Sequence, residues 1–130
     1  MKNFLILKKK ISRQNINNFV MHMAPCIEIV GYRQKKIGIK YLGDLCSDFG
    51  ANVKFIIGSK KKYKKININN LKTLLYSKKG NQKVNGNTNR VYKDPINSLI
   101  FTLNKIKKDK VKLSKNFFIF TGSTVGVVPI

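Results

Sequence analysis

The chain has 130 residues, of which 42% are hydrophobic, and this length and composition are those of one ordinary domain with tails. It carries 27 Lys and Arg but only 5 Asp and Glu, so its formal net charge is +22 and most of its cations have no acidic partner within the chain. The composition argues against a disordered polymer, and against a membrane partner because no stretch approaches the ~18 apolar residues that span a bilayer. A charge of this size predicts a fixed polyanion as the partner, foremost a nucleic acid.

Residues suited to catalysis or metal binding are scarce. Cys26 and Cys46 lie too far apart for a zinc knuckle, and we interpret them as small buried hydrophobic residues. His22 is the only histidine, and the chain has no close carboxylate pair and no phosphate-binding glycine loop. We therefore predict no metal, no cofactor and no enzymatic activity. The acids are scattered along the chain at Glu28, Asp44, Asp48, Asp94 and Asp109.

Residues 1–35 form the first predicted segment, a basic extension whose first 25 residues contain no acid. Its composition is also that of a transit peptide, but we expect an extension that lies on a partner molecule. Arg33, near its end, is one of only three arginines. Because Lys binds phosphate mostly as a point charge, a chain so dominated by Lys is expected to recognise little nucleotide sequence by itself.

Three short stretches after Pro25 have the alternation of strands. They are residues 26–33, 36–43 and 51–58, in which apolar and polar or small side chains alternate between turn residues. The spacing of the turns predicts a meander, a sandwich or a small barrel.

A basic run, residues 60–65, follows the third of these strands and is predicted to be a cationic loop. Tyr63 stands among its lysines, and two interpretations stay open: the ring stacks on a base or ribose, or it packs over the edge of the sheet. Residues 66–80 fit a helix or a strand equally well and end in Lys78 and Lys79. Residues 80–95 are dense in Gly and Asn and are expected to form a loop with several turns.

The last third of the chain predicts further strands. Leu99, Phe101 and Leu103 alternate with polar or smaller neighbours, and the basic run of residues 105–113 then has the form of a hairpin tip. Residues 116–130 predict an apolar strand, a Gly-Ser-Thr turn and a final apolar segment. Five or six strands with basic connections indicate a mainly all-β fold, a small five-stranded barrel with basic loops and an N-terminal extension.

Two turn motifs and their order along the chain carry a family resemblance. Ser47-Asp48-Phe49-Gly50-Ala51 is followed, one strand later, by Ile57-Gly58-Ser59-Lys60-Lys61-Lys62-Tyr63. These stretches resemble the Asp-Asn-Ser-Gly-Ala turn and the Gly-Gly-Ser, basic and Tyr motif of the universal large-subunit ribosomal protein fourteen family. Similar features follow in the family's order at residues 66–71, 99–110, 115–120 and 123–129, so the resemblance covers residues 36–130.

The resemblance implies a compact five-stranded barrel bound to large-subunit ribosomal RNA near the face that meets the small subunit. It implies contacts with neighbouring large-subunit ribosomal proteins and with the small subunit through an intersubunit bridge, and it favours a strand within residues 66–76. Residues 36–130 then form the RNA-binding domain, and residues 1–35 have no counterpart in the family. The bias toward Lys, Asn and Ile is typical of AT-rich coding and points to a mitochondrial ribosome, with a bacterial cytoplasmic ribosome as the alternative.

The predicted RNA-binding residues are basic or aromatic and lie in the expected loops and extension. Three alternatives stay open. The chain is another ribosomal protein, or it is a free-standing RNA-binding barrel, which is expected to show several aromatic side chains on one sheet face. The third is an enzyme acting on nucleic acid, which needs a cluster of acids or a histidine site. The predicted RNA-binding residues are Arg33, Lys60, Lys61, Lys62, Tyr63, Lys64, Lys65, Lys78, Lys79, Arg90, Lys105, Lys107, Lys108 and Lys110.

Overall fold

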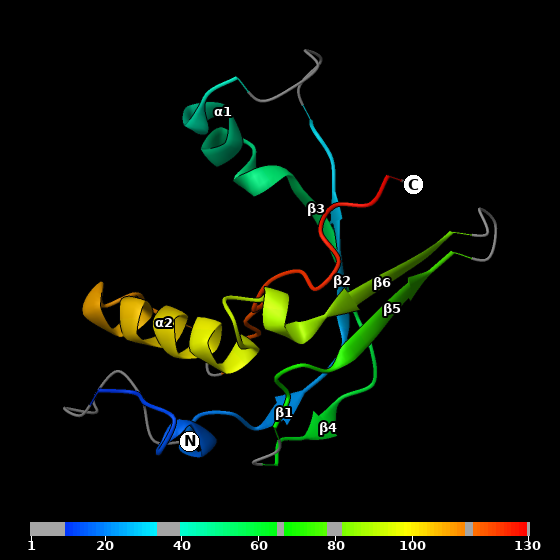
Figure 1. Ribbon diagram of the computed structural model, residues 1–130. Coiled ribbons are helices and arrows are strands. Elements are labelled where there is room, and N and C mark those ends of the chain that lie inside the picture. The colour runs from blue at the N-terminus through cyan, green and yellow to red at the C-terminus, as the bar shows by residue number, and fades with distance from the viewer. Residues whose placement is uncertain (1–9, 34–39, 65–66, 78–81, 114–115, 130) are drawn as a thin grey trace. The chain divides into compact units, whose positions relative to one another are not determined.

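The computed structural model describes residues 10–33, 40–64, 67–77, 82–113 and 116–129 (Figure 1). The chain folds into two compact units, one of residues His22–Tyr63 and the other of Met1–Met21 together with Lys64–Ile130. These units divide the chain differently from the predicted extension and domain, whose boundary after residue 35 stays a prediction.

The unit of residues His22–Tyr63 is built on two antiparallel ribbons. Strand β2 (Cys26–Val30) pairs with β3 (Asn52–Ile57), and the short strand β1 (His22–Met23) pairs with β4 (Lys61–Lys62). The predicted strands of residues 26–33 and 51–58 are thus confirmed over residues Cys26–Val30 and Asn52–Ile57. Both are rich in Ile and Val, whose branched side chains suit the pleated surface of a sheet.

The predicted strand of residues 36–43 is corrected by the structure. Residues 34–39 lie outside the described residues, and helix α1 (Leu42–Ser47) begins where the strand was expected to continue. The carboxylate of Asp44 explains the start of this helix, because it accepts hydrogen bonds from the backbone N–H groups of Lys40 (3.1 Å) and Tyr41 (3.0 Å). An acid in the first turn also interacts favourably with the helix dipole. A 3-10 helix, η3 (Phe49–Ala51), leads from α1 to β3.

The other unit contains a third antiparallel ribbon, formed by β5 (Lys72–Tyr76) and β6 (Lys83–Asn87). Strand β5 confirms a strand in the ambiguous segment. Strand β6 lies where only a loop was predicted, and pairing with β5 rather than its own propensity explains it. Gly86 permits a close crossing there, since a Cβ atom at this position would lie 2.4 Å from the carbonyl oxygen of Thr124.

Helix α2 (Pro95–Lys108) replaces the predicted strand and basic hairpin of residues 99–110, so that prediction is wrong. The Asp94 side chain accepts a hydrogen bond from the backbone N–H of Ile96 (2.8 Å), and Pro95 occupies the first turn, where its missing N–H costs nothing. The buried residues Ile96 and Leu103 stand two turns apart on one face of the helix. Hydrophobic burial on this face outweighs the alternation that suggested a strand.

The core of this unit lies between α2 and residues 10–21. Ile11 is only 1% exposed, and Ile16 and Val91 are buried as well. Asn104 of α2 fixes Ile11 in place, since its side chain accepts from the backbone N–H of Ile11 (3.0 Å) and donates to the carbonyl of Ile11 (2.8 Å). Part of the predicted extension therefore packs on its own chain.

Residues 116–129 contain no strand, which corrects the predicted apolar strand of residues 117–120. Hydrogen bonds from other segments hold their backbone. Ser98 Oγ donates to the carbonyl of Thr121 (2.6 Å), and the backbone N–H of Asn87 donates to the carbonyl of Thr124 (3.1 Å). The predicted Gly-Ser-Thr turn is confirmed, because Ser123 Oγ accepts from the backbone N–H of Gly126 (3.0 Å).

The structure is strand-rich, as predicted, but the strands of the described residues pair as three separate two-stranded sheets and form no closed barrel there. Of the helices in the described part of the chain, none has the length and apolar character that crossing a bilayer requires.

Candidate nucleic-acid interface

The five carboxylates of the chain are all engaged by groups of the protein itself. Three of them form ion pairs, namely Asp94 with Arg13 (2.6 Å), Asp48 with Arg33 (2.7 Å) and Asp109 with Lys105 (2.9 Å). Asp44 holds the start of α1, and Glu28 accepts from the side chain of Asn52 (2.8 Å). The acids are thus used in contacts within the protein. The formal net charge of +22 must be neutralised by groups outside the chain.

Arg33 spans the left-handed turn that connects α1 to β3. Its guanidinium donates to the carbonyl (3.0 Å) and carboxylate (2.7 Å) of Asp48 and to the carbonyl of Asn52. Between these anchors, Phe49, Gly50 and Ala51 have φ values of 51°, 70° and 59°. The hydrogen bond from Arg33 lowers the pKa of the buried Asp48 carboxyl below its usual value.

This geometry gives Arg33 a structural task. The planar guanidinium reaches three oxygens from two nitrogens, a fork that the single ammonium nitrogen of a lysine lacks. Arg13 is used in the same way, since it donates to Asp94 (2.6 Å) and to Asn97 (2.7 Å) at the start of α2. Two of the three arginines thus tie the fold together, and the predicted RNA contact of Arg33 stays a prediction. Arg90 is exposed at the end of the 3-10 helix η4 (Thr88–Arg90).

The first predicted lysine cluster lies at β4. Lys61 and Lys62 form this short strand rather than a loop, with Met23 and His22 opposite them on β1. Lys60, Lys61, Lys62 and Lys64 are exposed, whereas Tyr63 is half-buried. Lys65 lies outside the described residues, as do Lys78 and Lys79.

The second predicted cluster lies at the C-terminal end of α2 and not at a hairpin tip. Lys105, Lys107 and Lys108 occupy the last turn, where cations interact favourably with the helix dipole, and Lys110 follows in a left-handed conformation (φ 51°). Lys105 and Lys108 are exposed and stand three residues apart on the helix, so their side chains lie close to the same face. Lys107 is half-buried.

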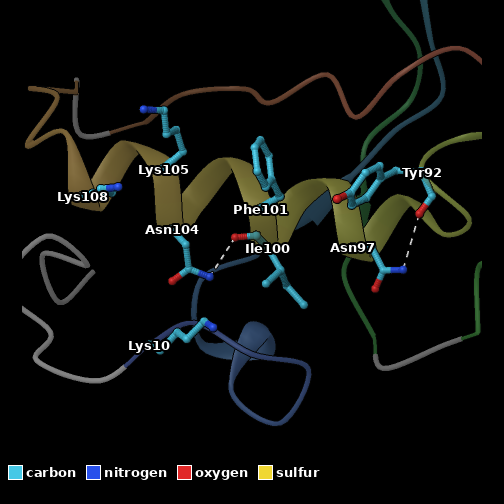
Figure 2. A pocket seen from close by; sticks show the side chains of 8 residues that line it. All are labelled: Lys10, Tyr92, Asn97, Ile100, Phe101, Asn104, Lys105 and Lys108. Atoms are coloured by element: carbon cyan, nitrogen blue, oxygen red, sulfur yellow. Dashed lines mark hydrogen bonds between the residues drawn. The ribbon is translucent and has the colours of Figure 1, made fainter.

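An open groove of about 500 Å³ lies along α2 beside this second cluster (Figure 2). Lys10, Lys105 and Lys108 line it together with the rings of Tyr92 and Phe101. The two ring centroids are 6.1 Å apart and the ring planes are inclined by 46°. Sequence reasoning missed both rings, because they become neighbours only when a helix, rather than a strand, follows the turn at residues 92–94.

The polar amides of the groove are already occupied. Asn104 holds the backbone of Ile11, and Asn97 accepts from Arg13 and donates to the carbonyl of Tyr92 (3.4 Å). What the groove offers to a ligand is therefore aromatic surface and lysine ammonium groups.

Residues that could support catalysis are dispersed. Within the described part of the chain, no group of three or more His, Cys, Asp or Glu side chains lies close enough to hold a metal ion. Cys26 and Cys46 are exposed, which corrects their interpretation as buried residues. Partial desolvation, and then repulsion by Glu28, raises the pKa of the Cys26 thiol, which favours the unreactive protonated form.

Comparisons with known protein families, with curated proteins and with solved structures find no match to this chain. The resemblance to the universal large-subunit ribosomal protein fourteen family therefore stays a prediction from its motifs.

Proposed function

We propose that the chain is a structural constituent of the ribosome that binds large-subunit ribosomal RNA through its lysines. One observation supports this most strongly: the formal net charge is +22, and all five acids are held within the fold. A compact protein with this surface repels itself unless a polyanion neutralises it. The exposed lysines at β4 and at the end of α2 are the groups that we assign to this contact.

The mechanism is electrostatic scaffolding. Each lysine that meets a phosphate releases condensed counterions from the RNA, and their release drives binding. Double-helical RNA presents its backbone and 2′-hydroxyls rather than its major-groove edges, so we expect recognition of folded shape rather than of sequence. Lysine suits this task because it contacts phosphate as a mobile point charge.

The place within the ribosome rests on the motif resemblance. It suggests contacts with neighbouring large-subunit proteins and with the small subunit through an intersubunit bridge. The five-stranded barrel belongs to the same proposal, as does the mitochondrial location with a bacterial cytoplasm as the alternative. A metal, a cofactor, a membrane partner and an enzymatic activity are not part of it.

A free-standing RNA-binding protein is the second candidate. The exposed ring pair of Tyr92 and Phe101 favours it, because proteins that bind single strands present aromatic side chains to bases. Recovery with ribosomal particles, described at the end of the Discussion, separates this candidate from the first.

The RNA-binding claim is tested by a salt titration of the full chain with large-subunit ribosomal RNA. If about 6 to 10 phosphates are contacted, affinity should fall by roughly 10³ to 10⁵ between about 50 and 200 mM salt. A variant with Lys60, Lys61, Lys62 and Lys64 changed to Gln should have a shallower slope, by up to ~0.9 for each lost contact. The matched variant changes Lys105, Lys107, Lys108 and Lys110 to Gln and should do likewise. Affinity that does not depend on salt in the unmodified chain would contradict the proposal.

A further inference from the structure

We propose that Tyr92 and Phe101 form a stacking site for an unpaired RNA base, with Lys105 and Lys108 beside it to contact the flanking phosphates. This inference rests on the proposed RNA-binding function and goes beyond it by naming a single-stranded segment as the occupant and two aromatic residues as its binding site. The starting observation is the groove along α2, which the two rings line together with Lys105 and Lys108; Figure 2 shows Tyr92 near the start of the helix and Phe101 next to Lys105.

Both rings are displayed rather than buried. Tyr92 is 66% exposed and Phe101 is 61% exposed, whereas the core face of α2 carries Ile96 and Leu103. Because the ring planes are inclined by 46°, the rings do not stack face to face on one another. Each ring thus keeps aromatic surface to offer to a flat ligand.

The backbone conformation at Tyr92 also supports a ligand-binding role for this residue. Tyr92 and Lys93 are consecutive residues with left-handed φ values of 49° and 63°, directly before the N-cap of α2. Glycine adopts this conformation at no steric cost, whereas a bulky residue does so only against an energetic penalty. Such outliers cluster at ligand contacts, and a ring that binds a ligand explains why a tyrosine stands at this position.

The charge around the rings selects a nucleic acid among flat ligands. The groove is lined by Lys10, Lys105 and Lys108, and no carboxylate is among its described lining residues. In Figure 2, Phe101 and Lys105 project to the same side of α2, one turn apart. Lys105 shares its charge with Asp109, so Lys108 is the stronger phosphate contact of the pair.

The occupied amides decide what the site can recognise. Asn97 and Asn104 are engaged by Arg13, by the carbonyl of Tyr92 and by the backbone of Ile11, so they are not poised to select a base by its edge. Stacking tolerates every base because each has a π face. We therefore expect binding of unpaired RNA with little sequence preference, in contrast to the duplex contacts assigned to the lysines alone.

The test measures binding of the full chain to a single-stranded uridine oligonucleotide of about eight nucleotides, within the range of single-strand binding sites. Phe101→Leu keeps an apolar, helix-favouring side chain but removes the ring. It should weaken binding by about 5- to 150-fold, the loss that follows removal of one stacked ring. The slope of affinity against salt should stay unchanged because a ring carries no charge, whereas Lys108→Gln should reduce that slope by up to ~0.7.

The control is Tyr41→Leu, which removes an exposed ring of the other unit and should leave binding unchanged. A second variant separates the site from the fold. Tyr92→Gly removes the ring and also relieves the left-handed backbone, so it should unfold at a higher urea concentration and yet bind the oligonucleotide more weakly.

The outcomes separate this inference from the function on which it rests. If the unmodified chain binds ribosomal RNA with a steep salt dependence but Phe101→Leu binds the oligonucleotide as tightly as the unmodified chain does, the stacking site is wrong and the RNA-binding proposal stands. If the chain binds neither RNA, both fail. If an acidic peptide binds in place of the oligonucleotide and its binding is sensitive to Phe101→Leu, the groove is a protein contact and the inference is overturned.

Discussion

At the scale of single residues, the Arg33 and Asp48 pair carries the most consequence. It bridges a turn in which three successive residues have left-handed φ values, and it consumes one of the few acids of the chain. A hydrogen bond from Arg33 lowers the pKa of Asp48, which means that folding favours the ionised carboxylate. The contribution of Asp48 to stability is therefore present above the usual Asp pKa of about 3.9 and is lost as the pH falls through the lower value of the folded state.

Asp48→Asn tests this account. The amide keeps the size of the side chain but cannot form the ion pair, so the variant should have a lower free energy of unfolding at pH 7 than the unmodified chain. Below about pH 4 the difference should shrink progressively, because Asp48 takes up a proton there in the unfolded chain and, at a lower pH, in the folded chain. Urea unfolding across a pH series checks this. A difference between the two proteins that stays constant from neutral to acidic pH would contradict the assigned role of Asp48.

At the scale of elements, α2 organises the unit that contains it. Its N-cap Asp94 both accepts from Ile96 N–H and pairs with Arg13, so it joins residues 10–21 to the start of the helix. Asp94→Ala should lower the free energy of unfolding by about 0.5 to 2 kcal/mol through loss of the cap. Asp94→Ser retains a capping oxygen and loses only the ion pair with Arg13, whose side chain is largely exposed. It should therefore lower the free energy of unfolding much less than Asp94→Ala does. Urea unfolding followed by helical circular dichroism compares the two, and equal losses would show that the cap is not the source.

The elements also show what the sequence can predict. Strands β2 and β3 follow from alternating Ile and Val side chains, and a strand over residues 72–76 was one of two expected forms. Helix α2 was missed because Leu99, Phe101 and Leu103 alternate, although Asp94 followed by Pro95 is a helix start signal. Alternation over a few residues cannot distinguish a strand from a helix whose buried face spans two turns. Pairing with β5 makes β6 a strand despite its Asn and Gly content, and no local sequence pattern predicts this pairing.

The candidate site divides in the same way. Composition alone predicts a polyanion partner and the exposed lysines, and the structure places Lys60, Lys61, Lys62 and Lys64 at the surface around β4. The contact between the rings of Tyr92 and Phe101 could not be predicted from the sequence, since the two residues are nine positions apart and become neighbours only through the turn before α2. Nor does sequence show that Arg33 would serve the fold, because that depends on the oxygens gathered at one turn.

At the scale of the whole molecule, the division of labour among charged residues is the central feature. Two of the three arginines and all five acids are engaged by groups of the protein itself, and among the described residues every lysine except Lys107 is exposed. Lys60, Lys61 and Lys62 of the first cluster belong to the unit of residues His22–Tyr63, whereas Lys64 and the second cluster at the end of α2 belong to the other unit. A protein built in this way is stabilised by the polyanion that it binds.

The most direct test of the proposed function is sedimentation of the tagged chain from cells that express it. A structural constituent of the large ribosomal subunit should travel with large ribosomal particles through gradients at physiological salt, and it should dissociate as the salt concentration is raised because its contacts with RNA rest on charge. A variant in which both lysine clusters are changed to Gln serves as the control and should shift toward the light fractions. We predict recovery of the unmodified chain with the large particles. Recovery only in light fractions would contradict the account.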